Sequence, residues 1–244
     1  MSPATLIFAV AVVAIGGFVR GYSGFGSALI WVSGLSLVLP PALVIPTTYL
    51  LDIAASVHLL PAAWRQVDWR SLRWLLLGAC AATPAGIYLL ANAPATPIRV
   101  AISVVVFTAA ALMWRGFRLK ATPGAVPAVA TGCLCGVLNG AVGIGGPPAI
   151  LFYFSSPVAA AVSRASLIAF FAVIDIVAIA AAAGQGLVTG EVFVLSAILV
   201  LPTLAGIALG NRRFLRTEPE TFRRFALIFL AVLSVGVFLR AVVG

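Results

Sequence analysis

The chain has 244 residues, of which 63% are hydrophobic and 9% are charged, with a formal net charge of +9. So few polar residues cannot cover a water-soluble globule, which excludes a soluble protein and predicts an integral membrane protein. The apolar residues run continuously instead of alternating, which indicates membrane helices and not a membrane barrel. Nucleic acid is not an expected partner, because the basic residues lie between apolar runs, as the positive-inside bias requires.

In chain order, the apolar runs predict two kinds of membrane segment. Two segments, 6–39 and 126–154, are interrupted by glycine-rich turns, and each either crosses once as a kinked helix or folds back as a hairpin. The others are long enough to span a bilayer as single helices. These six predicted full spans are 42–60, 72–90, 100–114, 167–183, 192–209 and 225–239.

Charge favours the hairpin for both interrupted segments. Lysine and arginine gather in three loops, 65–73, 115–120 and 212–224, whereas loops 91–98 and 184–191 contain neither residue. All three basic loops face the cytoplasm only if each interrupted segment crosses the membrane an even number of times. Each half of the chain then has three full spans, so the two halves enter the membrane in opposite orientations.

The two glycine-rich turns also identify an internal duplication. Their glycines match at a constant offset of 119 residues, from Gly17 to Gly136 and from Gly26 to Gly145. Asp52 and Asp175 lie in similar apolar surroundings in the two halves. The predicted fold is therefore an all-α polytopic membrane protein with two inverted repeats, 1–121 and 122–244. Each repeat is a broken glycine-rich helical hairpin plus three transmembrane helices, and together the repeats form one transmembrane domain.

Broken helices at matching positions of two repeats are the best sequence indicator of a transporter's binding site. A helix that restarts at Ser27 or at Pro147 directs free N–H groups and its positive dipole end toward the break, which suits an anion. Arg20 adds a charge with up to five donors, and Asn139 is its equivalent in the second half. The candidate substrate-binding residues are Arg20, Gly21, Ser23, Gly24, Gly26, Ser27, Asn139, Gly140, Gly143, Gly145, Gly146 and Pro147.

Helix packing is the alternative explanation of these glycines, because small residues line many membrane interfaces. In that case Arg20 extends to a membrane surface instead of facing a ligand. Packing alone does not require the same break twice, so the repetition favours a binding site.

The motifs Gly21-Tyr22-Ser23-Gly24-Phe25-Gly26-Ser27 and 140–147 resemble the duplicated glycine motif of the TauE/SafE, or sulfite exporter, family. The resemblance covers nearly the whole chain, and where this chain has Ser27 the family usually has glycine. It implies a membrane permease, and an exporter, for sulfite or a related organosulfur anion such as an organosulfonate. The broken segments would supply the site, and the location would be the bacterial inner membrane. No cofactor is expected, and assembly into a homo-oligomer is left open.

Ionisable groups inside membrane segments are costly and therefore candidates for function. Asp52 and Asp175 are candidate coupling residues, because a carboxyl in a dry site can hold a proton at neutral pH and release it when the site wets or a cation approaches, as proton-coupled transport requires. The alternative is a structural role for both. His58 is expected near the cytoplasmic surface, and Arg164, at the start of a span, is either an entrance charge for anions or a positive-inside anchor. The three cysteines lack the spacing of a metal site.

Two other functions remain as alternatives. A passive anion channel can share the fold of a transporter and differ only in gating. An intramembrane serine protease of the rhomboid type would use Ser23, within Gly21-Tyr22-Ser23-Gly24, and His58 as its base. That enzyme leaves the second glycine turn unexplained, so the sequence predicts a transporter and not an enzyme.

Overall fold

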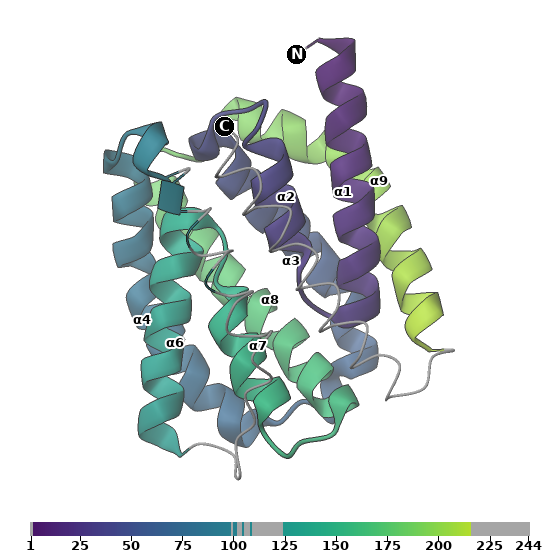
Figure 1. The fold of residues 1–244 in the computed structure, drawn as a ribbon, viewed down its shortest axis with the longest axis vertical. Coiled ribbons are helices and arrows are strands. Elements are labelled where there is room, and N and C mark those ends of the chain that lie inside the picture. The colour runs from purple at the N-terminus through teal and green to yellow at the C-terminus, as the bar shows by residue number, and fades with distance from the viewer. Residues whose placement is uncertain (1, 99, 102–103, 105–107, 109–123, 216–244) are drawn as a thin grey trace.

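A computed structural model describes residues 2–98, 100–101, 104, 108 and 124–215. Within these residues, six helices are long and apolar enough to cross a membrane, so we describe the chain as a multi-pass membrane protein. Two short α-helices and one 3-10 turn accompany them within the described residues (Figure 1). The long helices are α1 (Pro3–Ser23), α3 (Pro41–Ala63), α4 (Trp69–Asn92), α6 (Ala125–Val142), α8 (Ala160–Gly184) and α9 (Gly190–Phe214), and the short elements are α2 (Ser27–Leu35), η1 (Trp64–Gln66) and α7 (Gly146–Ser155).

Four of the predicted full spans are confirmed as helices. The runs 42–60, 72–90, 167–183 and 192–209 lie within α3, α4, α8 and α9. The predicted span 100–114 lies largely outside the described residues, and 225–239 lies wholly outside them. The two interrupted segments each contain one helix of spanning length followed by one short helix, which are α1 with α2 and α6 with α7.

Both interrupted segments fold back on themselves. Gly24 and Gly143 end α1 and α6 with φ of 79° and 69°, a left-handed conformation that glycine adopts without the steric cost of a side chain. In the first hairpin the Trp31 indole N–H donates to the carbonyl of Val13 at 3.1 Å. In the second, Gly145 lies against Asn139. The short helices therefore run antiparallel to the long ones and do not continue them as kinked spans.

Glycines allow two pairs of long helices to pack closely, α1 with α9 and α4 with α6. Gly17 and Gly21 of α1 lie against the backbone of α9 at Thr203 and Ile207, so the two helices run parallel. Gly132 and Gly136 of α6 pack in the same way against α4. A Cβ atom at any of these glycines would stand 2.1–2.5 Å from a carbonyl oxygen of the partner helix. Backbones approach this closely only without side chains between them.

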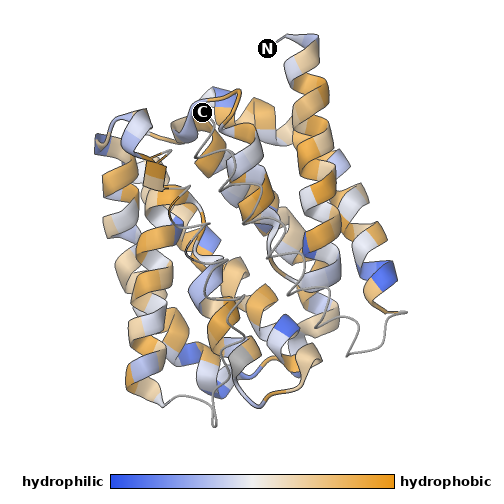
Figure 2. Ribbon diagram, in the orientation of Figure 1, coloured by the Kyte–Doolittle hydropathy of each residue, from blue (hydrophilic) through white to orange (hydrophobic). Residues whose placement is uncertain are grey.

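The exterior of the bundle is apolar, and its mostly hydrophobic interior contains several buried polar and charged residues. Large hydrophobic side chains such as Ile7, Leu77, Val194 and Leu201 are more than half exposed, and the long helices are predominantly hydrophobic along their length (Figure 2). These exposed faces suit contact with lipid tails. The buried polar and charged residues near the two hairpins include Arg20, Ser23, Ser27, Asp52, Asn139, Arg164 and Asp175.

Apart from Arg20, which lies at the chain breaks, the described basic residues gather at one end of the bundle. The turn that joins α3 to α4 carries Arg65 and Arg70, and its Asp68 backbone N–H donates to Ser166 near the start of α8. The basic end of α9, with Arg212, meets the start of α8 as well, through the bond from Arg164 to Asn211. The loop that contains Gln185 joins the other ends of α8 and α9. This grouping is the one that the charge pattern of the loops predicts.

Candidate functional site

The two chain breaks meet at one small pocket in the middle of the bundle. Gly26, Ser27 and Ala28 line it from the first break, and Ile144 and Gly146 line it from the second. The short helices α2 and α7 begin here, and no side chain caps either of their N-termini. Their first-turn N–H groups and positive dipole ends therefore lie beside the pocket, an arrangement that favours negative charge.

Arg20 supplies the positive charge of this pocket and is fully buried. Its Nη1 donates to the carbonyl of Gly24, and its Nη2 donates to Ser56 Oγ at 3.2 Å. Its Nε lies 3.2 Å from Oδ1 of Asp52, close enough for an ion pair. The Nε–H nevertheless lacks a hydrogen-bond acceptor, because the carboxylate is not aligned with it. The guanidinium also lies 4.7 Å from the centre of the Phe171 ring.

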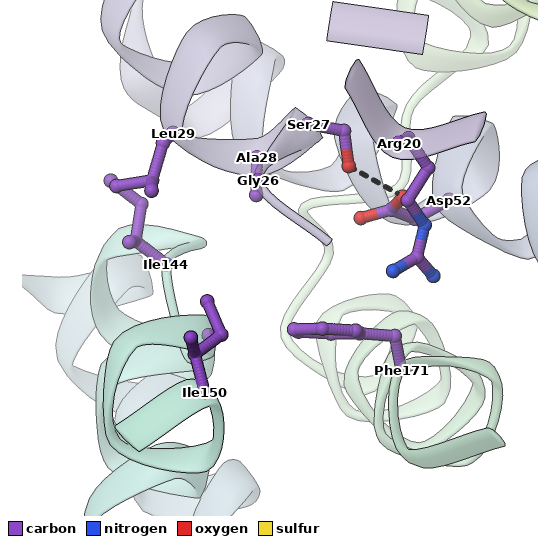
Figure 3. A pocket seen from close by; sticks show the side chains of 10 residues that line it. Arg20, Gly26, Ser27, Ala28, Leu29, Asp52, Ile144, Ile150 and Phe171 are labelled. Carbon is purple, nitrogen blue, oxygen red and sulfur yellow. Dashed lines mark hydrogen bonds and ion pairs between the residues drawn. The ribbon is translucent and has the colours of Figure 1, made fainter. Parts of the chain in front are cut away.

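Asp52 is held at the centre of α3 by groups from two other helices. Ser27 Oγ, in the first turn of α2, donates to Asp52 Oδ1 at 2.9 Å, and Arg20 comes from α1. Figure 3 shows Arg20, Asp52 and Ser27 together on one side of the pocket. A buried ion pair adds little net stability, but loss of one partner leaves an uncompensated charge and is costly.

The second repeat places a similar pair at the equivalent position. Asn139, 119 residues after Arg20, donates from Nδ2 to Asp175 Oδ1 at 3.1 Å. The Asn139 carbonyl accepts a hydrogen bond of 2.5 Å from the Tyr49 hydroxyl of α3. Asp175 is 2% exposed, and no described residue forms a hydrogen bond with its Oδ2. Asp52 is thus paired with the cation of Arg20, whereas Asp175 is paired with the amide of Asn139.

The remainder of the pocket wall is apolar. Leu29, Ile144 and Ile150 lie opposite the charged pair, and the ring of Phe171 lies beside the Arg20 guanidinium (Figure 3). The cavity measures about 10 Å³, which is room for about one water molecule. An anion with three oxygens requires the walls to move apart, so this conformation is a closed one.

Arg164 is buried at the basic end and closes the end of α1. Its Nη2 donates to the carbonyl of Gly21 at 2.5 Å and to Asn211 Oδ1 at 3.0 Å, and its Nε donates to the carbonyl of Tyr22 at 3.2 Å. A cation at a helix C-terminus satisfies carbonyls that lack helical partners and complements the dipole. Arg164 thus joins α1, α8 and α9, and its side chain is buried between helices at the basic end of the bundle.

Ser23 and His58 do not form a catalytic pair. The Ser23 hydroxyl bonds to the carbonyls of Val19, at 2.8 Å, and Phe25, at 2.6 Å, and is fully buried. His58 is exposed on α3. A serine nucleophile needs its base within hydrogen-bond reach, so these contacts favour a structural role for Ser23 in the turn after α1.

The predicted substrate-binding residues divide into those that line the pocket, those that shape the chain breaks and those that pack the helices around it. Four line the pocket: Arg20, Gly26, Ser27 and Gly146. Others shape the breaks or pack the helices around it. Gly21 lies in the contact between α1 and α9, and Gly140 lies in the contact between α4 and α6. Ser23, Gly24 and Gly143 form the turns that end α1 and α6. Gly145 lies against Asn139, whose side chain donates to Asp175, and Pro147 is in the first turn of α7.

Sequence reasoning missed the apolar wall of the pocket. It also missed two polar contacts near the pocket, that of Ser56 with Arg20 and that of Tyr49 with Asn139. Leu29, Ile150 and Phe171 carry no chemical signal of their own in a sequence that is mostly apolar. Helical spacing does point to Phe171, which lies one turn before Asp175, and to Ser56, which lies one turn after Asp52. The same reasoning finds Tyr49, three residues before Asp52.

Comparison with known proteins identifies the family. The model of the sulfite exporter TauE/SafE family matches residues 8–237, nearly the whole chain. The chain belongs to the TauE/SafE family. It is 27% identical over 239 residues to a protein of Cupriavidus necator named "Probable sulfite/organosulfonate exporter TauE", covering 95% of this chain and 93% of that protein. No solved structure matches the chain.

Proposed function

We propose that this member of the TauE/SafE family exports a small sulfur oxyanion across the bacterial inner membrane, bound between the two broken hairpins. The supporting observation is the pocket itself, which both breaks line and which contains the buried charge of Arg20. Two uncapped helix N-termini and one guanidinium suit the oxygens of a sulfonate or sulfite group. The name of the Cupriavidus necator relative agrees with this substrate class.

The apolar wall favours organosulfonates over bare sulfite. A pocket with a cationic side at Arg20 and an apolar side at Leu29, Ile144 and Ile150 matches an anion with a short hydrocarbon group. Burial of each CH₂ group contributes roughly 0.8 kcal/mol, which inorganic sulfite cannot provide. We therefore expect short alkanesulfonates to bind more tightly than sulfite.

A conducting pore needs a continuous water-filled path, whereas the pocket holds about one water molecule, so this conformation does not conduct. A closed passive channel fits this cavity equally well, and the choice of a transporter rests on the family and on the helix contacts. The helix contacts support inverted repeats that move relative to each other. The α1–α9 and α6–α4 contacts correspond when the halves are exchanged, and α1 runs parallel to α9 as α6 does to α4.

Thermal stabilisation of the purified protein by anions tests the proposal. Ligands that bind the native state raise its unfolding temperature by mass action. We expect stabilisation in the order ethanesulfonate, methanesulfonate, sulfite, with little effect of acetate at equal ionic strength. Export of the best ligand from loaded vesicles then tests transport. If none of the sulfur oxyanions stabilises the protein more than acetate does, the proposed substrate class is wrong.

A further inference from the structure

We propose that Asp52 and the transported anion compete for Arg20, so that each monovalent anion binds together with one proton on Asp52. This inference rests on the proposed function and adds to it the number of protons that accompany each bound anion. The carboxylate of Asp52 occupies the position beside the guanidinium that a substrate oxyanion would take, and a proton allows it to give up that position.

Among the described residues that contact Arg20, Asp52 already places an anion beside the guanidinium. Nη1 and Nη2 donate to Gly24 and Ser56, Nε faces Asp52, and one side lies near the Phe171 ring. An oxyanion that bonds to the Nε–H must therefore displace Asp52. The oxygen of Asp52 does not accept the Nε–H. A substrate oxygen that does accept this buried N–H gains a charge-assisted hydrogen bond, which the carboxylate does not make.

Charge balance then determines what must accompany the anion. Arg20 and Asp52 together are neutral, so an added monovalent anion leaves one unbalanced negative charge in a buried site, which is costly. A proton taken from water forms an O–H bond on one Asp52 oxygen and restores neutrality. When the anion leaves, that proton returns to the solvent on the same side and Asp52 pairs with Arg20 again.

The other charged groups around Asp52 do not replace this proton. Asp175, on α8, interacts with Asp52 but supplies no positive charge, and Arg164 on α8 is engaged with the end of α1. On α2 the nearest polar group is the Ser27 hydroxyl, and Tyr49 on α3 donates to the Asn139 carbonyl. The charged groups of the remaining described elements packed against α3 lie at helix ends, namely Arg65 on η1 and Glu191, Arg212 and Arg213 on α9.

Isothermal titration with methanesulfonate, which stays ionised throughout the accessible pH range, measures the linkage directly. Titrations at one alkaline pH in two buffers of different ionisation enthalpy give the number of protons taken up per anion. We expect the wild type to take up close to one proton for each anion bound, and its affinity for methanesulfonate to fall about tenfold for each unit by which the pH rises. Asp52→Asn should take up none and bind with the same affinity at every pH. Glu191→Gln, which removes an exposed carboxylate at the far end of α9, should behave as the wild type.

Two results would overturn the proposal while leaving the proposed function intact. One is methanesulfonate binding to the wild type without proton uptake. The other is uptake that persists in Asp52→Asn and disappears in Asp175→Asn, which would place the proton on the second aspartate. Failure of every sulfur oxyanion to bind would instead contradict the proposed function.

A second variant keeps the test decisive if Asp52→Asn does not fold. Ser27→Ala retains both charges and removes the donor that stabilises the Asp52 carboxylate. We expect methanesulfonate to bind this variant several-fold more tightly than the wild type at alkaline pH, because the carboxylate accepts its proton more readily. Unchanged affinity would show that Asp52 does not compete with the anion.

Discussion

Arg20 and Asn139 occupy equivalent positions, 119 residues apart, and each contacts an aspartate of the next long helix, Asp52 or Asp175. The geometry is repeated, but the charge is not. The first pair is a cation with an anion, and the second is an amide with a carboxyl whose Oδ2 has no hydrogen-bond partner among the described residues. The two pairs are thus alike in geometry and different in charge.

Replacement of Arg20 tests whether its charge binds the ligand. We expect Arg20→Gln to weaken binding of the stabilising anion by about 1.5–3 kcal/mol, the range for hydrogen bonds to charged groups. Arg20→Lys should recover only part of the loss, since an ammonium lacks the planar pair of donors. Isothermal titration of the folded variants measures both effects. Affinities within about twofold of the wild type would mean that Arg20 is a structural cation.

Arg164 provides the matched control for Arg20, because it is also a buried arginine but lies at the basic end of α1. Arg164→Gln should lower the stability of the protein by about 1–3 kcal/mol, since the carbonyls of Gly21 and Tyr22 lose their donor. The anion affinity of the folded protein should stay within about twofold. Thermal unfolding and titration of the same sample separate the two effects, and a large loss of affinity with unchanged stability would contradict the assigned role.

The glycine contacts predict sharply different effects of alanine at two positions. Gly132→Ala places a Cβ atom 2.1 Å from the carbonyl oxygen of Leu75, so α4 and α6 must separate. Overpacking of this kind costs about 1–3 kcal/mol. Gly190→Ala, in the first turn of α9, meets no atom within 4 Å and should be neutral or slightly stabilising. Unfolding temperatures in detergent compare them, and equal effects would refute the close contact.

Orientation in the membrane follows from the positions of the basic residues. A cysteine at Gln185 should react with an impermeant maleimide added to intact cells, whereas a cysteine at Arg212 should react only after lysis. Both residues are exposed, so protection reports the side of the membrane and not burial. The unmodified chain, whose native cysteines lie in α4 and α6, gives the background. Equal reaction of both positions in intact cells would exclude this topology.

Ile150 tests the apolar side of the pocket. Ile150→Ala removes hydrocarbon surface opposite Arg20, so it should weaken binding of propanesulfonate more than binding of methanesulfonate. The difference should be on the order of 0.8 kcal/mol for each CH₂ group that the isoleucine covers. Titration of both ligands against wild type and variant gives the comparison. An equal loss for both would mean that Ile150 acts only through the shape of the cavity.

Periodicity and charge predicted the helices well, because long apolar runs and the positions of arginine are local properties of the sequence. They also located the breaks at Gly24 and Gly143, where glycine permits the backbone to turn. What they missed depends on contacts between distant segments. The roles of Gly21 and Gly140 in helix packing, and the bond from Arg164 to the end of α1, require knowledge of which helices lie side by side.

The parallel pairing of α1 with α9 has a consequence for biosynthesis. The glycine face of α1 enters the membrane first, but its partner is made only when most of the chain has been synthesised. Until then α1 must remain in the bilayer without its packing surface covered, held by its own apolar residues and by α2. The α4–α6 pair, much closer in the chain, can associate earlier. We expect the first hairpin to be the last part of the protein to assemble, and therefore the part that quality-control proteases recognise when α9 is damaged.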